Sequence, residues 1–384
     1  MLHGALIVSV AAGAAGLAFV FVNEWLIPRL ARGGAAPGPR PRVSIVIPAR
    51  NEERDVEAGV RSHLAQDYGN FEVVVVEDRS TDATPRILER LSREDSRLRV
   101  VPGAELPEGW LGKPHALAQG AALSGGELIL FADADVRYHP RALSEAVTYF
   151  AARKLDFLML IPQFEMRGFW ENVLMPYLLV AFFQAPSFLA NWQRPRWIAA
   201  GGGAGNLVRR TVYEGVGGHR ALADSVVDDV RLAFAVKGAG YRVGLVRADD
   251  RIAVRMYRGF REVFDGFTKN FAYVYQGLAG LLLLGITVLT LGTGLLPAGA
   301  LVADLVGLSL PSADVVLAAV ACGLAVFSRV VLAVSYSEPL WPALTHPIMA
   351  AVWSGILLRS LFQRFVRRRL TWRGRTFAAR RARF

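Results

Sequence analysis

Long apolar segments at both ends of the chain limit its possible folds more than any other feature. Segments of this length can satisfy their backbone polar groups inside a bilayer only as helices. One segment lies near the N-terminus and three near the C-terminus, at Ala5–Val22, Leu278–Val302, Val315–Val334 and Trp341–Leu361. With 384 residues, of which 53% are hydrophobic, the chain is therefore expected to be a multi-pass membrane protein with a soluble middle region.

The distribution of arginine predicts the orientation in the membrane. No Lys or Arg precedes the first apolar segment, whereas four arginines follow it, Arg29, Arg32, Arg40 and Arg42. The positive-inside rule then places the N-terminus outside and the middle region in the cytoplasm, at the inner (plasma) membrane. The alternative is a cleaved signal peptide, but such peptides usually have a basic start and a small-residue cleavage site.

The net charge of +11 comes largely from residues near the termini. This predicts an anionic membrane surface as a partner, and no nucleic acid. The single cysteine, Cys322, lies in an apolar run, which excludes a disulfide and a cysteine-ligated zinc site.

Three C-terminal crossings would place the arginine-rich tail outside, against the positive-inside rule. The last apolar segment, with Pro342 and Pro347 near its start, is therefore expected to lie in the interface or to re-enter it. The predicted organisation is an N-terminal anchor, a linker, a catalytic domain, transmembrane or interfacial helices and a basic cytoplasmic tail, at residues 1–28, 29–41, 42–270, 271–363 and 364–384.

The middle region alternates between β-branched runs and helical patterns, which predicts a Rossmann-like α/β domain with a mostly parallel sheet. Strands are expected at Val43–Ala49, Phe71–Asp78, Leu98–Val101, Glu127–Phe131 and Asp156–Ile161, and helices at Glu53–Ala65, Ala83–Ser92, Lys113–Leu123 and Pro140–Ala151. Ligands of such sheets bind beyond the carboxyl ends of the strands.

Polar residues follow the first two strands: Pro48, Arg50 and Glu52, then Glu77 and Asp78. Acids at the second strand end suit hydrogen bonds to a ribose or a base. Asp82 in the next turn is an equally good helix N-cap. No Gly-x-Gly-x-x-Gly motif and no Gly-Lys-Ser/Thr loop is present, so neither a dinucleotide-binding fold nor a P-loop is supported.

The fourth strand ends in two carboxylates, Asp133 and Asp135. Residues i and i+2 of a strand point to the same side, so both acids are expected to leave the sheet together. A divalent cation, Mg²⁺ or Mn²⁺, would relieve their repulsion and also take oxygens from a substrate diphosphate. The alternative is a loop of two solvated acids.

Lys113 lies in the first turn of a predicted helix, where a positive charge opposes the helix dipole. It is therefore expected to meet a ligand phosphate or base. The alternative is an ordinary surface lysine.

Several of these motifs resemble the nucleotide-sugar half of family 2 glycosyltransferases, which have the GT-A fold. They are Ser44–Glu52, Val76–Asp82, Gly112–Leu117 and Asp133–Asp135. Three later motifs are similar to the acceptor half of that family, namely Gly201–Arg210, Gly217–His219 and Val227–Val230.

The resemblance implies that Asp229 is the catalytic base, with Asp228 beside it raising the apparent pKa of the pair. A base is needed because the hydroxyl acceptor loses its proton as it attacks the sugar C1 in one inverting displacement. Gly203 is expected near a ligand, and Arg255 and Arg258 could offset the charge of the leaving diphosphate. The alternative for the two acids is simply the N-terminus of a helix.

The element Arg255-Met-Tyr-Arg258-Gly259 is similar to the Gln/Arg-x-x-Arg-Trp element of membrane-bound members, with glycine in place of tryptophan. The tail residues Trp372–Arg375 resemble the end of lipid-modifying members, such as ceramide, carotenoid and hopanoid-associated glycosyltransferases. The implied donor is a nucleotide-diphosphate sugar, in particular a UDP-sugar, and the implied acceptor is a lipid. The alternatives are a processive polysaccharide synthase, a haloacid-dehalogenase-type phosphatase with Asp133 as nucleophile, and a non-enzymatic membrane scaffold.

The segment Phe169–Trp192 is rich in aromatic residues but interrupted by polar ones. It is expected to lie in the membrane interface, and the alternative is a buried helix packed on the sheet. His219 is interpreted as a structural histidine.

Overall fold

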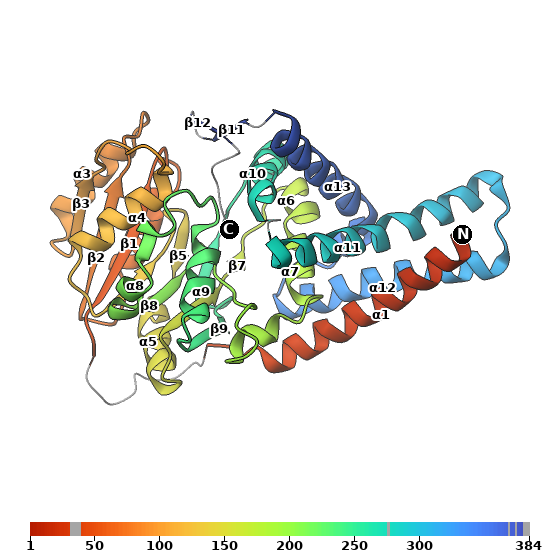
Figure 1. The fold of residues 1–384 in the computed structure, drawn as a ribbon, viewed down its shortest axis with the longest axis horizontal. Helices are drawn as coiled ribbons and strands as arrows, with labels where there is room; N and C mark the ends of the chain where they lie inside the picture. The colour runs from red at the N-terminus through yellow and green to blue at the C-terminus, as the bar shows by residue number, and fades with distance from the viewer. Residues whose placement is uncertain (31–39, 275–276, 368, 373–374, 379–384) are drawn as a thin grey trace. The chain divides into compact units, whose positions relative to one another are not determined.

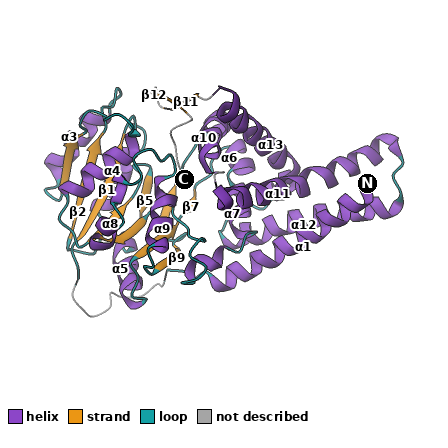
Figure 2. Cartoon of the chain, viewed as in Figure 1, coloured by secondary structure: helices purple, strands orange, loops and turns teal. Residues whose placement is uncertain are grey.

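The structure is a computed structural model that describes residues 1–30, 40–274, 277–367, 369–372 and 375–378. It divides into two compact units. The α/β unit comprises Ile27–Glu165 and Phe188–Met256, and the helical unit comprises Met1–Leu26, Met166–Ser187 and the described residues from Tyr257 onward. Apart from one short hairpin, the strands of the described residues lie in the α/β unit (Figure 2).

A seven-stranded sheet forms the centre of the α/β unit (Figure 1). Its order is β3 (Leu98–Pro102), β2 (Phe71–Glu77), β1 (Val43–Ala49), β4 (Leu128–Phe131), β8 (Asn206–Arg209), β6 (Phe157–Ile161) and β9 (Val243–Arg247). Only β8 runs antiparallel to its neighbours, so the predicted mostly parallel sheet is confirmed. A smaller sheet contains β5 (Val136–Tyr138), β10 (Ile252–Val254) and β7 (Gln163–Phe164).

Helices cover both faces of the large sheet, because alternate residues of each strand point to opposite sides. Ile45 and Ile47 of β1 belong to one hydrophobic core, and Val46 between them belongs to the other. The helices of this unit are α2 (Val56–Leu64), α3 (Thr84–Glu94), α4 (Gly112–Leu123), α5 (Ala142–Ala152), α8 (Arg210–Gly215) and α9 (Asp228–Gly238).

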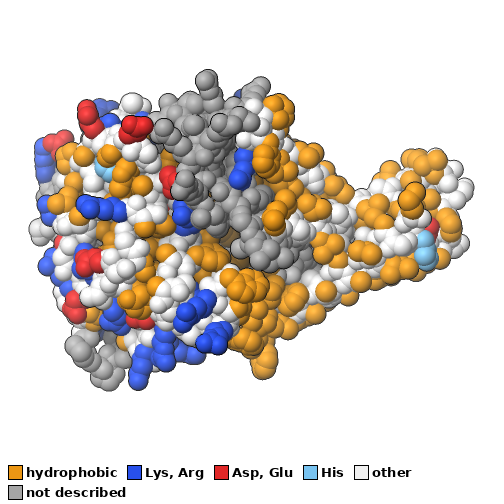
Figure 3. All heavy atoms as spheres, in the orientation of Figure 1, with side chains coloured by type: hydrophobic (Ala, Val, Ile, Leu, Met, Phe, Trp, Pro, Cys, Tyr) orange, Lys and Arg blue, Asp and Glu red, His pale blue; other side chains and the backbone are white. Residues whose placement is uncertain are grey.

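The helical unit contains four helical segments that are long and apolar enough to cross a membrane, one N-terminal and three C-terminal. They correspond to α1 (Leu2–Leu26), α11 (Gly277–Ala303), α12 (Ser312–Ser335) and α13 (His346–Phe362). A further helix, α10 (Gly259–Val274), precedes α11 in the chain. Hydrophobic side chains cover most of the visible surface of α1, α11 and α12 (Figure 3). The predicted linker falls largely on residues 31–39, outside the described residues; in the predicted tail, β11 (Arg369–Trp372) pairs with β12 (Arg375–Ala378).

The segment Phe169–Trp192 is divided between the two units, since residues 169–187 belong to the helical unit and residues 188–192 to the α/β unit. α6 (Phe169–Leu174) and α7 (Pro176–Phe183) belong to the helical unit, where α6 contacts α10 and α13 and α7 contacts α1 and α12. The polar residues in this segment have local partners. The Glu171 carboxylate accepts hydrogen bonds from the backbone N–H groups of Arg167 (3.0 Å) and Gly259 (3.2 Å).

Candidate active site

The reversed direction of β8 assembles the site. Because β8 is antiparallel, its first residue lies at the edge where the parallel strands end: Asn206 pairs with Phe131 of β4 and with Met159 of β6. The glycine-rich segment before β8 therefore lies beside the residues that follow β4, and the Asp133 N–H donates to the Gly203 carbonyl at 2.8 Å. The motifs assigned to the donor and acceptor halves meet at this point.

A narrow cavity of about 10 Å³ lies at this edge. Five separate parts of the chain supply its polar lining: the start of α4, the end of β4, the segment around the start of β8, the short turn Gly218–Arg220, and the start of α9. The polar and glycine residues that line it are Lys113, Asp133, Gly202, Gly203, Asn206, His219, Asp228 and Asp229.

Lys113 forms an ion pair with Asp133, with 2.7 Å between Nζ and Oδ1. The lysine was expected to meet a ligand; in the structure its nearest anion is this carboxylate. Burial alone would lower the Lys113 pKa, but the charges of Asp133, Asp228 and Asp229 raise it above its ordinary value. The lysine is therefore charged at neutral pH and is the positive centre of an acidic cluster.

Asp228 and Asp229 are the first two residues of α9, so the prediction that they mark a helix N-terminus is confirmed. Burial, together with the charges of Asp228 and Asp133, raises the pKa of Asp229 to about 6, although Lys113 opposes this rise. For Asp228, Lys113 and His219 outweigh the effect of burial and lower the pKa. The expectation of a raised pKa is thus confirmed for Asp229 and wrong for Asp228, because the Lys113 charge and the contact with His219 stabilise the Asp228 carboxylate.

Two residues that line the site were not predicted as site residues: Asn206 was not singled out, and His219 was interpreted as structural. His219 is buried, with Nε2 3.5 Å from an Asp228 carboxylate oxygen and Nδ1 2.9 Å from the Tyr213 hydroxyl. Asn206 is buried too; its Oδ1 accepts from the Gly202 N–H at 3.2 Å, and its Nδ2 donates to the Asp229 carbonyl at 3.4 Å. One sequence feature could have indicated both residues: each is a polar residue that directly follows glycine, Gly205 before Asn206 and Gly218 before His219.

The glycine run is explained by contacts within the protein. A Cβ atom on Gly203 would collide with the Asp133 carboxylate, and one on Gly201 with the backbone carbonyl of Asp229. The sequence suggested that glycine here allows close approach of a ligand. In the structure, the absence of a side chain at Gly201 and Gly203 lets Asp229 and Asp133 pack closely against the backbone of the glycine run.

Asp135 is not among the residues that line this cavity. β4 ends at Phe131, and residues 134–135 form a turn, so the two-residue alternation of a strand no longer applies. Asp135 is partly buried in that turn.

A second polar region lies at the ends of β1 and β2. Arg50 Nη1 donates to the Asp78 carbonyl at 2.5 Å and lies 4.0 Å from the buried Asp78 carboxylate. The Glu77 carboxylate accepts from the Ser80 N–H at 2.6 Å, and the Glu52 N–H donates to the Thr84 hydroxyl. Pro48 lies in β1 itself.

Asp78 is not among the residues that line the Asp229 cavity. The two polar regions are therefore separate parts of one sheet edge. The two arginines after β10 belong to different units, Arg255 to the α/β unit and Arg258 to the helical unit. The backbone N–H of Arg258 donates to the Glu262 carboxylate at 2.9 Å.

Residues 44–217 match the model of Glycosyl transferase family 2. Over 206 residues the chain is 30% identical to a beta-monoglucosyldiacylglycerol synthase of Nostoc sp., covering 51% of this chain and 41% of the relative. Over 233 residues it is 25% identical to the 4,4'-diaponeurosporenoate glycosyltransferase of Staphylococcus haemolyticus, covering 60% and 61%. The chain thus spans less than two thirds of the length of these relatives.

A solved mannosyltransferase from Pyrobaculum calidifontis, in complex with GDP-Man and Mn²⁺, aligns with 92% of this chain and 98% of its own, at a TM-score of 0.60 and 22% identity. This likeness supports the fold. The haloacid-dehalogenase hypothesis is wrong, since the family match includes Asp133 and the surrounding sheet. Residues 44–217 are therefore similar to family 2 glycosyltransferases, and the fold is the GT-A fold of the solved mannosyltransferase.

Proposed function

We propose that this protein transfers a sugar from a nucleotide-diphosphate sugar, in particular a UDP-sugar, to a hydroxyl group of a membrane lipid, with inversion at the sugar C1. The observation that carries the proposal is the Asp229 carboxylate. Its pKa of about 6 and its place beside the Lys113–Asp133 ion pair suit a general base at a site for an anionic donor.

In the proposed reaction, the acceptor oxygen forms a bond to the sugar C1 while its proton passes to Asp229. The bond between C1 and the phosphate oxygen breaks, and its electron pair leaves with the nucleoside diphosphate. One displacement without a covalent intermediate inverts the configuration. Asp228 remains ionised between His219 and Lys113 and helps to keep the Asp229 pKa high.

Arg50, Glu77 and Asp78 are proposed to bind the nucleoside, with Pro48 and Glu52 shaping the ends of that region. Lys113 is proposed to contact the diphosphate, because its ammonium group lines the cavity and already binds an anionic oxygen, that of Asp133. Arg255 and Arg258 are proposed to offset charge on the diphosphate, and Gly203 to border the donor.

The carboxylates of Asp133 and Asp135 would hold Mg²⁺ or Mn²⁺, for which hard oxygen ligands are suitable. Among the described residues, no group of three or more His, Cys, Asp or Glu side chains is arranged for a metal. The remaining ligands would therefore be diphosphate oxygens and water, as is common for Mg²⁺. When bound, the ion would offset the charge of the leaving group.

A lipid acceptor is proposed because the chain has four membrane-length apolar helices and because the relatives are named for a glucosyldiacylglycerol and a carotenoid acid. The α/β unit is proposed to face the cytoplasm of the inner membrane, in line with the arginines after α1. The last apolar segment is proposed to lie in the interface. A protease-accessibility assay with a tag on the tail checks this topology, and cleavage from the outside would contradict it.

The function is tested by incubating the purified full-length protein in nanodiscs with a panel of nucleotide sugars and total membrane lipid. The product is identified by mass, with and without a chelator. A lipid carrying one hexose, formed only without chelator, is the expected product. A sugar polymer would favour a processive synthase, and no transfer from any donor would contradict the proposal.

A further inference from the structure

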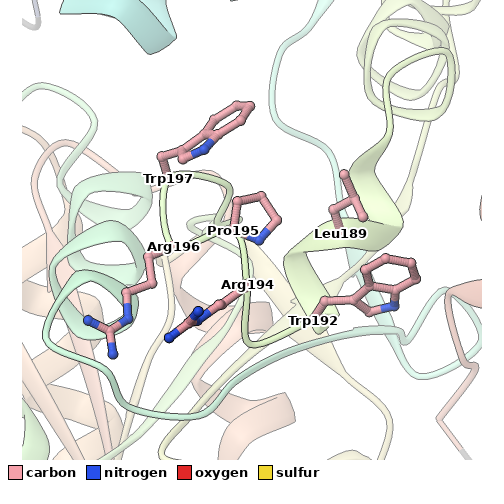
Figure 4. A pocket seen from close by; sticks show the side chains of 6 residues that line it. All are labelled: Leu189, Trp192, Arg194, Pro195, Arg196 and Trp197. Atoms are coloured by element: carbon pink, nitrogen blue, oxygen red, sulfur yellow. The ribbon is translucent and has the colours of Figure 1, made fainter.

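An exposed loop of the α/β unit combines tryptophan and arginine (Figure 4). It follows the short helix η1 (Ser187–Asn191), and it opens as a shallow pocket of about 540 Å³. The lining residues are Leu189, Trp192, Arg194, Pro195, Arg196 and Trp197. Trp192 and Trp197 are 53% and 59% exposed, although large aromatic side chains are ordinarily buried.

The base of this loop is firmly attached to the protein. The buried ammonium group of Lys237 donates to the carbonyls of Leu189 (3.2 Å), Ala190 (3.1 Å) and Ile198, and so joins the two ends of the loop. The Asn191 side chain exchanges two hydrogen bonds with the backbone of Leu245 in β9, at 2.6 and 3.1 Å. The outward position of the two tryptophans is therefore not a consequence of a loose loop.

Its two arginines have no ionic role within the fold. In the part of the chain that the structure describes, the Arg194 and Arg196 guanidinium groups form no hydrogen bond or ion pair, and both side chains are exposed. Figure 4 shows both extending away from the backbone of the loop. Two free guanidinium groups next to exposed indoles form a surface that suits phosphate oxygens bordered by apolar material.

The hydrogen bonds to Leu245 also place the loop beside the strand that binds the first residues of the α/β unit. Two residues beyond Leu245 on the same strand, the Arg247 N–H donates to the Pro28 carbonyl at 2.8 Å, and the Leu30 N–H donates back at 2.7 Å. Pro28 follows the last residue of α1 by only two positions, and Trp25 at that end of α1 is 83% exposed, as is typical of an interfacial tryptophan. The root of the loop thus lies on the same strand as the partner of Pro28, which only Ile27 separates from α1 along the chain.

We propose that the loop Leu189–Trp197 is a second membrane contact, through which the α/β unit binds the headgroup layer of anionic phospholipids. Trp192 and Trp197 lie at the level of the headgroups, and Arg194 and Arg196 bind their phosphates. This contact holds the catalytic unit at the bilayer surface, independently of which sugar or acceptor the enzyme uses. The partner is the bulk anionic lipid surface rather than one acceptor molecule.

The test uses the full-length protein with Cys322→Ala and one introduced cysteine, Trp192→Cys, labelled with an environment-sensitive fluorophore. A second protein carries Trp197→Cys. As the control, Arg93→Cys places the label on the exposed face of α3, beside the strand at the opposite edge of the sheet from β9. Each protein is reconstituted in nanodiscs of phosphatidylcholine alone or with phosphatidylglycerol, with or without a nitroxide on the lipid headgroup.

With phosphatidylglycerol, the labels at 192 and 197 are expected to emit at shorter wavelength and to lose about half of their intensity to the nitroxide, and the label at 93 is expected to do neither. Arg194→Gln/Arg196→Gln should remove the effect of phosphatidylglycerol. Emission typical of water at both loop positions would overturn the proposal. A blue shift without nitroxide quenching would overturn it as well, because the loop would then be covered by protein. Equal quenching with and without phosphatidylglycerol would overturn the assigned preference for anionic lipid, because phosphatidylcholine carries a phosphate group as well.

Discussion

The two polar regions at the edge of the sheet differ in how completely their charges are satisfied. In the Asp229 cavity, three carboxylates surround one lysine, and the Asp229 pKa is raised to about 6. At the ends of β1 and β2, several polar side chains have backbone partners in the neighbouring loop. The side chain of Asn51 accepts from the Thr81 N–H at 2.8 Å, and that of Glu53 from the Ala83 N–H at 2.9 Å.

This contrast suggests a division of labour. Groups with unbalanced charge can change protonation state during a reaction, and perturbed pKa values concentrate at functional sites for that reason. A closed hydrogen-bond network between two loops is stiff and keeps its shape when a ligand binds. We therefore expect mutations in the cavity to affect turnover and mutations at the β1–β2 edge to affect donor binding or stability.

The largest effect is expected for Asp229→Asn, which keeps the shape of the side chain but removes the proposed base. The kcat should fall by about 10³, with little change in donor affinity, because general base catalysis typically contributes 10² to 10⁴. Initial rates and donor binding by calorimetry measure the two quantities. Asp224→Asn, an acid paired with Arg231 just before the same helix, is the control and should keep its activity. Transfer by Asp229→Asn at the wild-type rate would show that the base lies elsewhere.

Asp78→Ala is expected to raise the KM for the nucleotide sugar about tenfold and to leave kcat nearly unchanged. The reason is the loss of a hydrogen bond to the nucleoside, since hydrogen bonds to charged groups are worth about 1.5–3 kcal/mol. Steady-state kinetics with varied donor separates the two parameters. A fall in kcat as large as that of Asp229→Asn would end the distinction between the two regions.

The pH dependence of kcat/KM should show an acid limb near pH 6. Asp229 acts as a base only when ionised, so the rate should fall about tenfold for each pH unit below its pKa of about 6. Lys113 lowers this pKa, so Lys113→Met should move the limb to higher pH. Rate profiles between pH 4.5 and 8, about two units on either side of the expected limb, test both statements. An unmoved limb in Lys113→Met would mean that another group titrates.

The smallest effect is expected for Asp82→Ala, a stability change at the β1–β2 edge. The Asp82 carboxylate accepts hydrogen bonds from the backbone N–H groups of Thr84 (3.0 Å) and Glu53 (3.1 Å), so its loss should cost about 1 kcal/mol. Partial burial raises the Asp82 pKa, but these hydrogen bonds outweigh it and lower the pKa below the unfolded value of 3.8. The stabilisation is therefore fully present above pH 3.8 and is lost as the pH falls through the lower pKa of the folded protein. Thermal unfolding at pH 7 measures the change. As the control, Glu89→Ala on the following helix, α3, removes only an exposed ion pair with Arg93, so it should shift Tm less. Equal shifts would remove the special role of the loop network.

The sequence alone determined most elements of the first part of the α/β unit, up to Ile161, and their order. Val43–Ala49 was predicted to the residue, and the helix expected at Glu53–Ala65 differs mainly at its start, where the backbone turns at Glu52 before α2 begins at Val56. The four apolar segments were likewise evident. These features follow from local periodicity and hydrophobicity, which neighbouring residues in the chain are sufficient to specify.

Only the tertiary structure decided how the site is assembled. The antiparallel direction of β8 brings Asn206 and Gly203 to the end of β4, and this arrangement depends on hydrogen bonds between strands far apart in sequence. The Lys113–Asp133 ion pair, the opposite pKa shifts of Asp228 and Asp229, and the assignment of Phe169–Phe183 to the helical unit have the same origin. Charge, burial and packing depend on which segments meet, and residue spacing along the chain does not contain that information.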